Sequence, residues 1–352
     1  MNSDIITHGR WAIMLKTTSV SLMAVGLALA VSAILIFIAG VNPLTAYLAL
    51  LKGAFGDSFA IGNTLAKTTP LIFTGLAVAF AFRCNLLNIG AEGQLYAGGL
   101  ASVCVGIFVT GFPAYIHIPL AILSGFAAGA IWGGLAGYLR ATRGINEIIS
   151  TIMLNFIAIF FVSYLVHGPL AEPPGFYHQT ALIEITARLP VLMPKSDLSI
   201  AIIIAIFIAI IVAYILWRTP FGLKLRAVGL SSKAAKFSGI PVNRYTVGAM
   251  SISGGLAGLA GTAEIIGGQY RLLDFFSPGY GFDGIAVAFL GRSDPIGVIF
   301  AAFLFAALRV GANQMQRTTG LPTSLVLVIQ GMVILFIMGV VLREWLKNRK
   351  QA

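Results

Sequence analysis

Charged residues are scarce in this sequence. They make up 10% of its 352 residues, whereas 58% are hydrophobic and the mean hydropathy is +0.93. A soluble domain carries about 25% charged residues, so this chain lacks the charge to cover a water-facing surface. Its apolar runs of about twenty residues are long enough to cross ~30 Å of hydrocarbon as helices. The sequence therefore predicts an all-α polytopic membrane protein.

Residues and motifs that carry enzyme chemistry are also few. The sequence has 12 acidic residues and 4 histidines. It contains neither an H-E-x-x-H metal motif nor a G-x-x-x-x-G-K-[ST] phosphate-binding loop. Cys84 and Cys104 lack metal-ligand or disulfide spacing, and we expect them to pack as small apolar residues. The longest non-apolar stretches, 168–198 and 218–244, are too short for an independent catalytic core. We therefore expect no enzyme activity and no metal or cofactor bound by this chain.

The basic excess has a membrane explanation. The formal net charge is +11, but lysine and arginine fall in the short segments between apolar runs. This distribution is typical of the cytoplasmic loops of membrane proteins, whereas nucleic-acid-binding domains gather basic residues on one folded face. We therefore expect no nucleic-acid partner. The basic segment 218–244 is predicted to be cytoplasmic, and 168–198, with two bases and three acids, is predicted to lie outside.

The hydropathy pattern predicts about ten transmembrane helices. Apolar runs lie near residues 20–40, 65–82, 94–111, 118–139, 148–167, 199–217, 245–267, 296–310 and 322–342, and a shorter run occupies 282–291. The first run is too long for a cleaved signal peptide. Ten crossings, one of them short or broken, place both termini and every basic cluster in the cytoplasm. The predicted parts are a cytoplasmic N-terminus (1–19), a transmembrane domain (20–342) with the cytoplasmic loop 218–244, and a cytoplasmic tail (343–352).

Two of these runs carry glycine at regular spacing. A glycine every third or fourth residue forms a stripe along one face of a helix, and in lipid such a stripe lets a neighbouring backbone approach closely. The predicted packing glycines are Gly125, Gly129, Gly133 and Gly137 in the fourth run and Gly254, Gly258 and Gly261 in the seventh.

Three polar stretches interrupt or flank the apolar runs. They are NLLNIGAEGQ (85–94), GINEIISTIMLN (144–155) and the break between Gly267 and Arg292. Polar residues at membrane depth are costly unless they are paired or line a cavity, and paired interruptions in two halves of a transporter indicate a substrate pathway. The candidate pathway residues are Asn85, Asn88, Glu92, Gln94, Asn146, Ser150, Asn155, Phe156 and Asp283.

Simpler interpretations of these stretches stay open. Residues 85–94 could form a plain cytoplasmic turn in which Arg83 pairs with Glu92. The polar stripe in 144–155 could serve interhelical hydrogen bonding. Phe156, Phe160 and Tyr164 could form an aromatic platform for a base.

The loop RTPFGLKLRAVGLSSKAAKFSGIPVNRY predicts a docking element. Ser231 and Ser232 can cap a short helix through Lys233–Ser238, Gly239 can end it, and Pro241 prevents its continuation. Such a capped helix in a basic cytoplasmic loop suits contact with another protein rather than catalysis.

The motifs resemble those of one transporter family. TPFGLKLRAVGLSSKAAKFSGI resembles the coupling loop of permeases in bacterial ABC importers of the branched-chain amino acid and ribose type. NIGAEGQLYAGG, GINEIISTIMLNFIA and FDGIAVAFLGRSDPIG are similar to segments of the nucleoside or simple-sugar permeases of that superfamily. The resemblance covers about residues 60–340.

This resemblance implies the partners and the location. It implies a permease subunit in the bacterial cytoplasmic (inner) membrane that works with a second, related permease. Two P-loop ATPase subunits would hold ATP and Mg²⁺, and an extracytoplasmic solute-binding protein would deliver the small-molecule solute. ATPase coupling would fall on Arg218, Pro220, Phe221, Gly222, Arg226, Gly229, Ala235, Ser238 and Gly239.

Two alternatives remain. The same class of permease could carry simple sugars or branched-chain amino acids instead of nucleosides. An ion-coupled secondary transporter would need an intramembrane carboxylate, for which Glu264 is the candidate.

Overall fold

The computed structural model describes residues 29–174 and 177–321, together with Gly26, Leu27 and a few isolated positions between 324 and 339. Within these residues every extended regular element is a helix, and the β-pairing is limited to two isolated bridges. The predicted all-α class is therefore confirmed. The chain forms two compact units, residues 61–306 and residues 1–60 with 307–352.

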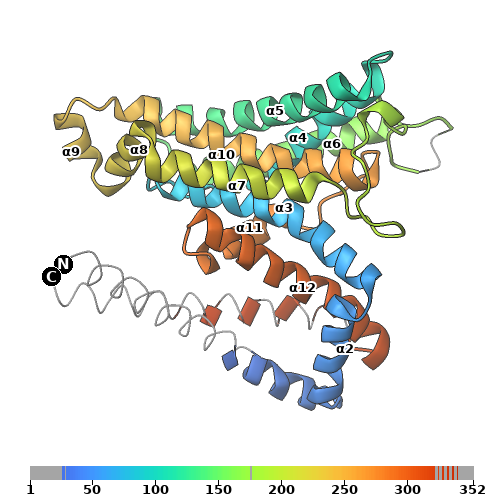
Figure 1. The fold of residues 1–352 in the computed structure, drawn as a ribbon. Coiled ribbons are helices and arrows are strands. Elements are labelled where there is room, and N and C mark those ends of the chain that lie inside the picture. The colour runs from blue at the N-terminus through green and yellow to red at the C-terminus, as the bar shows by residue number, and fades with distance from the viewer. Residues whose placement is uncertain are drawn as a thin grey trace, which may run out of the picture. The chain divides into compact units, whose positions relative to one another are not determined.

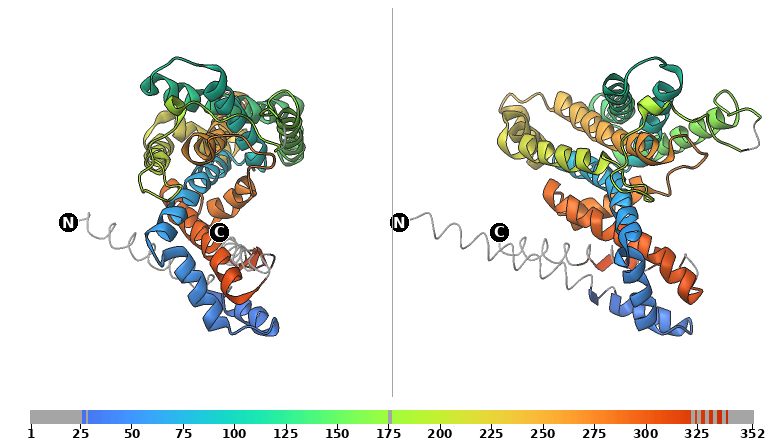
Figure 2. Two further views of the ribbon diagram at one scale, coloured as in Figure 1. Left: turned by 90° about the vertical axis from the view of Figure 1, so that its right-hand side faces the viewer. Right: turned by 45° about the vertical axis from the view of Figure 1, so that its right-hand side comes forward.

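The larger unit is a bundle of long helices. Figure 1 shows α5 and α10 side by side, with α8 and α9 at one end of the bundle and the segment that precedes α7 at the other. The right-hand view in Figure 2, turned by 45°, shows α8 and α9 at the same end. The helices of this unit, with those that enter it, are α3 (Ser58–Phe82), α4 (Ala91–Phe108), α5 (Ala114–Arg143), α6 (Glu147–His167), α7 (Ala201–Arg218), α8 (Pro220–Leu230), α9 (Ser232–Phe237), α10 (Val242–Glu264), the π-helical turn η2 (Ile265–Gln269), α11 (Tyr280–Leu290) and α12 (Pro295–Thr319).

The smaller unit contains a helix that the hydropathy pattern did not predict. The segment α2 (Pro43–Phe55) begins where Asn42 accepts a hydrogen bond from the Leu44 N–H and Pro43 occupies the first turn. It follows Leu29–Ile38 at an angle of 118°. The cap and the proline restart a helix directly after the first apolar run, because both favour a helix N-terminus.

Six described helices are long and apolar enough to cross a membrane, or seven if the bent pair counts as one span. These six are α3, α5, α6, α7, α10 with η2, and α12. The helix α4 has sufficient length, but Glu92 and Gln94 in its first turn lower its hydropathy, and α11 is shorter. The predicted termini, 1–19 and 343–352, and most of the run 322–342 lie outside the described residues.

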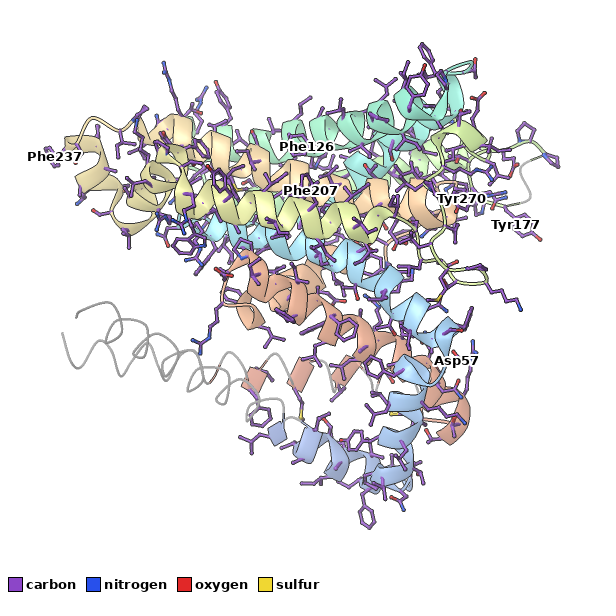
Figure 3. The ribbon with its side chains drawn as sticks, in the orientation of Figure 1. Asp57, Phe126, Tyr177, Phe207, Phe237 and Tyr270 are labelled. Carbon is purple, nitrogen blue, oxygen red and sulfur yellow. The ribbon has the colours of Figure 1, made fainter. Side chains whose placement is uncertain are left out.

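The core of the larger unit depends on close contact between α5, α10 and α4. A Cβ atom added at Gly129 would meet the carbonyl of Gly254, and one at Gly133 would meet that of Met250. A Cβ atom added at Gly98 of α4 would meet the backbone of Gly258. Phe126, labelled in Figure 3, covers Gly255. The helix backbones thus touch directly, with almost no side chain between them.

We expect Gly258→Ala to destabilise the protein by about 1–3 kcal/mol, because its methyl group meets backbone atoms of Gly125 and Gly129 that cannot yield locally. Thermal unfolding in mild detergent measures the effect. Gly248→Ala, on the same helix, is the control, since a Cβ there meets nothing within 4 Å. Equal melting temperatures for the two variants would contradict this packing.

Candidate functional site

The first polar break is the connection between α3 and α4. Residues 83–90 form a turn, in which Asn85 adopts a left-handed conformation with φ 56°. Glu92 and Gln94 lie just beyond it, in the first turn of α4. The side chains nevertheless face the protein core, because Asn88, Glu92 and Gln94 are each at most 2% exposed. Asn85, by contrast, is exposed, so only the second half of the break carries buried polar groups.

Asn88 and Gln94 bind each other and the neighbouring helix α10. The Asn88 Nδ2 donates to Gln94 Oε1 at 2.8 Å and to Ser253 Oγ at 2.7 Å, and Gln94 Nε2 donates back to Asn88 Oδ1 at 3.1 Å. Ser253 in turn donates to the Ala77 carbonyl of α3 at 2.6 Å. The network ties three helices together where water is excluded, so a change at any one member leaves a buried polar group without a partner.

Asn155 of α6 holds the turn from the other side. Its Oδ1 accepts a hydrogen bond from the Gly93 N–H at 2.7 Å, and its Nδ2 donates to the Ile89 carbonyl at 2.8 Å. It therefore satisfies one backbone group of the turn and one unpaired N–H in the first turn of α4. A Cβ at Gly93 would meet the Asn155 Cα, so this position needs glycine for the close approach.

The two glycine-rich breaks meet at Glu92. The Glu92 Oε2 accepts a hydrogen bond from the Gly281 N–H, in the first turn of α11, at 2.6 Å. An acidic group is favourable there because the helix N-terminus carries partial positive charge. Asp283 lies in the same turn. Arg83 donates elsewhere, to the Ser293 carbonyl, so the pairing of Arg83 with Glu92 considered above is not formed.

Three other candidates lie apart from this buried network. Asn146 caps α6 by accepting from the Ile148 N–H, and Ser150 donates to the Glu147 carbonyl of its own helix. Phe156 is 51% exposed and stacks on Phe160 along the outer face of α6. These aromatic rings therefore point away from Asn155.

The loop after α7 forms two short helices. Thr219 caps α8 through the Gly222 N–H, and Pro220 occupies its first position. Ser231 caps α9 through the Ala234 N–H, Ser238 is its C-terminal cap, and Gly239 follows with φ 76°. The helix α8 did not follow from the sequence pattern, because its two glycines obscure the helical signal.

Side chains of this loop anchor it to the bundle. The Phe221 ring lies 5.4 Å from that of Tyr245, and Gly222 packs on the backbone of Leu216. Ala235 is buried at the base of α9, whereas Arg218 is exposed. We call residues 219–239 the coupling segment.

The coupling segment touches the first polar break directly. A Cβ at Gly229 would meet the Arg83 carbonyl oxygen, with the carbonyl carbon of Cys84 at 3.1 Å. Beside this contact lies a polar cavity of about 460 Å³. It is lined by residues of the break such as Asn85, by residues of the coupling segment such as Ser231, and by Arg140. Movement of α8 must therefore displace the turn at the end of α3 or open this contact.

Arg83 links the same region to the second break. Its guanidinium donates to the Ser293 carbonyl at 2.7 Å, in the turn between α11 and α12. Two arginines contact the Trp217 ring, with the Arg83 Cζ 4.9 Å and the Arg226 Cζ 4.6 Å from its centroid. Because Arg226 belongs to α8, cation–π contacts connect α8, the end of α7 and both breaks.

The apolar tips of the coupling segment are uncovered. Phe237 is 94% exposed and Leu230 is 89% exposed. Figure 3 labels Phe237 at the end of the bundle where α8 and α9 lie. Such side chains at the end of a short, cationic helix are suited to contact with another protein.

The sequence indicated Glu264 as an intramembrane carboxylate, but it did not predict the ion pair that Glu264 forms with Lys67. The Lys67 Nζ lies 3.4 Å from Glu264 Oε2, and the carboxylate is 7% exposed. Lys67 sits within an apolar helix and was not singled out, although an intramembrane lysine calls for a partner. The paired Glu264 needs no coupling ion to balance its charge. Among residues 29–174 and 177–321, no group of three His, Cys, Asp or Glu side chains could hold a metal.

We expect Cys84 to react slowly with maleimide at pH 8, because burial raises the pKa of its thiol to about 12 and the thiolate is the reactive form. In a Cys104→Ser background, Gly229→Val pushes α8 away from Cys84, lowers that pKa and speeds labelling by about 10-fold or more. Gel-shift labelling over time measures the rate. Leu230→Val is the control, and equal rates in all three proteins would show that Gly229 does not cover Cys84.

Comparison with known proteins identifies the family. The family described as "Branched-chain amino acid transport system / permease component" matches residues 60–338. The chain is 39% identical to the guanosine ABC transporter permease protein NupP of Bacillus subtilis over 90% of this chain and 92% of that protein.

Two further relatives cover nearly as much. The nucleoside ABC transporter permease protein NupB of Lactococcus lactis is 36% identical over 90% of each chain. The glucose ABC transporter permease protein TsgB13 of Haloferax volcanii is 35% identical over 88% of this chain and 84% of its own. The resemblance drawn from the motifs is therefore confirmed: this chain belongs to the permease family of branched-chain amino acid transport systems.

Proposed function

We propose that this chain is the permease subunit of an ATP-driven importer for nucleosides or related sugar-containing solutes. The observation that carries the proposal is the contact of Gly229 with Arg83 and Cys84, which joins an exposed docking segment to a buried polar break. The chain supplies the translocation path and the coupling segment that moves it, and ATP hydrolysis takes place in partner subunits.

The proposed topology has ten crossings with both termini in the cytoplasm. The six span-length helices support it, together with the bent pair Leu29–Phe55, the polar-ended α4, the short α11 and the apolar run 322–342. With this arrangement the basic coupling segment and Arg140 face the cytoplasm, as the positive-inside rule requires. Lys67, Ser199 and Glu264 then lie toward the outer surface.

The proposed partners follow from the exposed surface and from the family. Phe237 and Leu230 offer apolar contact to a cytoplasmic P-loop ATPase, and Lys233 and Lys236 flank them with positive charge. A second permease subunit and an extracytoplasmic solute-binding protein complete the importer. The assembly lies in the bacterial cytoplasmic membrane.

The names of the relatives support the solute class. They are named for guanosine, for nucleosides and for glucose. All of these solutes carry a hydroxylated sugar ring and no net charge, which fits a path rich in amides and hydroxyls.

We assign Asn88, Glu92, Gln94, Asn155 and Asp283 to the gate of the path. In the conformation described, Asn88, Gln94 and Asn155 are hydrogen-bonded to one another, to Ser253 or to backbone groups. Opening the path therefore requires these hydrogen bonds to exchange for bonds to solute or water. Movement of α8 against Arg83 supplies the displacement that would start this exchange.

Affinity purification from the native membrane tests the assignment. We expect a P-loop ATPase to co-purify with the wild type, and Phe237→Glu to lose it, since a charge at the exposed tip disrupts an apolar contact. Tyr177→Glu is the matched control, because Tyr177 is 74% exposed at the opposite end of the bundle (Figure 3).

One outcome would contradict the proposal. If the chain purifies without an ATPase and still transports in sealed vesicles, and if an uncoupler abolishes uptake, the protein is an ion-coupled carrier. In that case Glu264→Gln should also abolish uptake.

A further inference from the structure

A second polar site lies at the other end of α10 from the coupling segment. A cavity of about 260 Å³ is bounded by α3, by the segment before α7, and by the end of α10 with its π-helical turn η2. Tyr270, labelled in Figure 3, immediately follows this turn. The volume is below the ~300 Å³ of pockets for whole drug-sized ligands, so the cavity suits a ring-sized part of a solute.

The wall of this cavity carries an ion pair with spare hydrogen-bonding capacity. The Glu264 Oε1 receives only a long contact of 3.5 Å from Lys67, and its Oε2 contacts Lys67 at 3.4 Å and Gln269 Nε2 at 3.1 Å. A carboxylate has about four acceptor positions. The pair is neutral as a unit, so it can meet an uncharged ligand without leaving net charge in the membrane.

One acceptor at this cavity has no partner among the described residues. The Gln269 Oε1 is buried without a hydrogen bond, while its Nε2 is held by Glu264 and by the Phe276 carbonyl. A buried polar atom left unpaired is costly, and a ligand donor is one way to satisfy it. The atom is enclosed in this conformation, so a ligand reaches it only when the Gln269 side chain turns toward the cavity, and because the atom is an acceptor that ligand must bring an N–H or O–H group.

The backbone here is shaped to keep the cavity open. The sequence IIGGQ forms a π-helical turn, a feature that occurs frequently at functional sites. A Cβ at Gly267 would meet the Ser199 Oγ at 2.5 Å, so this residue must stay small. At Gly268, which lines the cavity, a Cβ would meet nothing within 4 Å. The turn places Gln269 beside Glu264 and leaves room next to both.

We propose that this cavity binds the sugar ring of the solute, with Glu264 and Gln269 accepting hydrogen bonds from vicinal hydroxyl groups and Lys67 donating to a ring or hydroxyl oxygen. The inference rests on the proposed function and adds a binding subsite to it. A zwitterionic amino acid fits less well, because its ammonium and carboxylate groups would each compete with the existing ion pair.

Competition uptake with the complete importer tests the subsite. Labelled guanosine is the probe, and unlabelled guanosine or 2′,3′-dideoxyguanosine is the competitor. The ratio measured is the inhibitory concentration of dideoxyguanosine divided by that of guanosine. We expect this ratio to fall by about 10-fold in Glu264→Gln, because the charged acceptor of the hydroxyl groups is lost. The solute-binding protein is the same in every assay, so a changed ratio is due to the permease.

Glu172→Gln is the matched control. Glu172 forms an ion pair with Arg271 at 2.9 Å outside the cavity, and this variant should keep the wild-type ratio. The double variant Lys67→Met/Glu264→Gln leaves no unpaired charge and replaces the single variant if that one fails to reach the membrane. An unchanged ratio in whichever variant is produced would overturn the subsite.

Occlusion provides an independent readout that leaves the charges in place. Gly268→Leu fills the cavity and should lower guanosine uptake at least about 10-fold, while Gly248→Leu, also at a glycine with no neighbour within 4 Å, should keep it. Equal uptake by both variants would overturn the subsite. A wild type that takes up no nucleoside would instead refute the proposed function. If leucine competes with the labelled solute better than guanosine does, the cavity binds an amino acid and not a sugar ring.

Discussion

The contact between Gly229 and the backbone of Arg83 and Cys84 is the interaction on which the proposed mechanism depends. It places α8 directly on the turn that ends α3, with no side chain between the two backbones. Such a contact transmits displacement well, because packed backbone atoms cannot absorb movement as flexible side chains do. Residues on the far side of that turn, from Asn88 to Gln94, form the hydrogen-bonded network with α6 and α10.

Arg83 extends this link to the second half of the chain. Its bonds to the Ser293 carbonyl and its contact with Trp217 bring the turn between α11 and α12 into the same cluster as Arg226. Glu92 connects α4 to the start of α11 a few residues further on. The two glycine-rich breaks are therefore in physical contact, so in the proposed mechanism a single movement of the coupling segment would reach both. The close glycine contacts between α5 and α10 would form the rigid body against which that movement occurs.

The elements whose signals are local could be predicted from the sequence. The capped α9, the glycine stripes and the long apolar helices follow from spacing, capping residues and hydropathy, which the chain carries within about one helix length. The pairing of polar groups did not follow. Nothing near Asn155 indicates that it binds Gly93 and Ile89, about sixty residues earlier, and nothing near Lys67 points to Glu264. A buried polar residue indicates that it has a hydrogen-bonding or charged partner, but only the tertiary structure shows which residue that partner is. The helices α2 and α8 were missed because proline and glycine signal breaks as readily as they signal helix starts.

Simultaneous measurement of ATP hydrolysis and solute uptake in proteoliposomes tests the central claim most directly. The reconstituted importer would carry either the wild-type permease or Gly229→Val, which forces α8 away from Arg83 without altering the exposed tip of α9. The account predicts that the variant retains its ATPase subunits and their hydrolysis but loses at least about 10-fold of its uptake, because the ATPase still docks while the coupling segment no longer moves the turn. Uptake that stays coupled to hydrolysis at the wild-type ratio would contradict it.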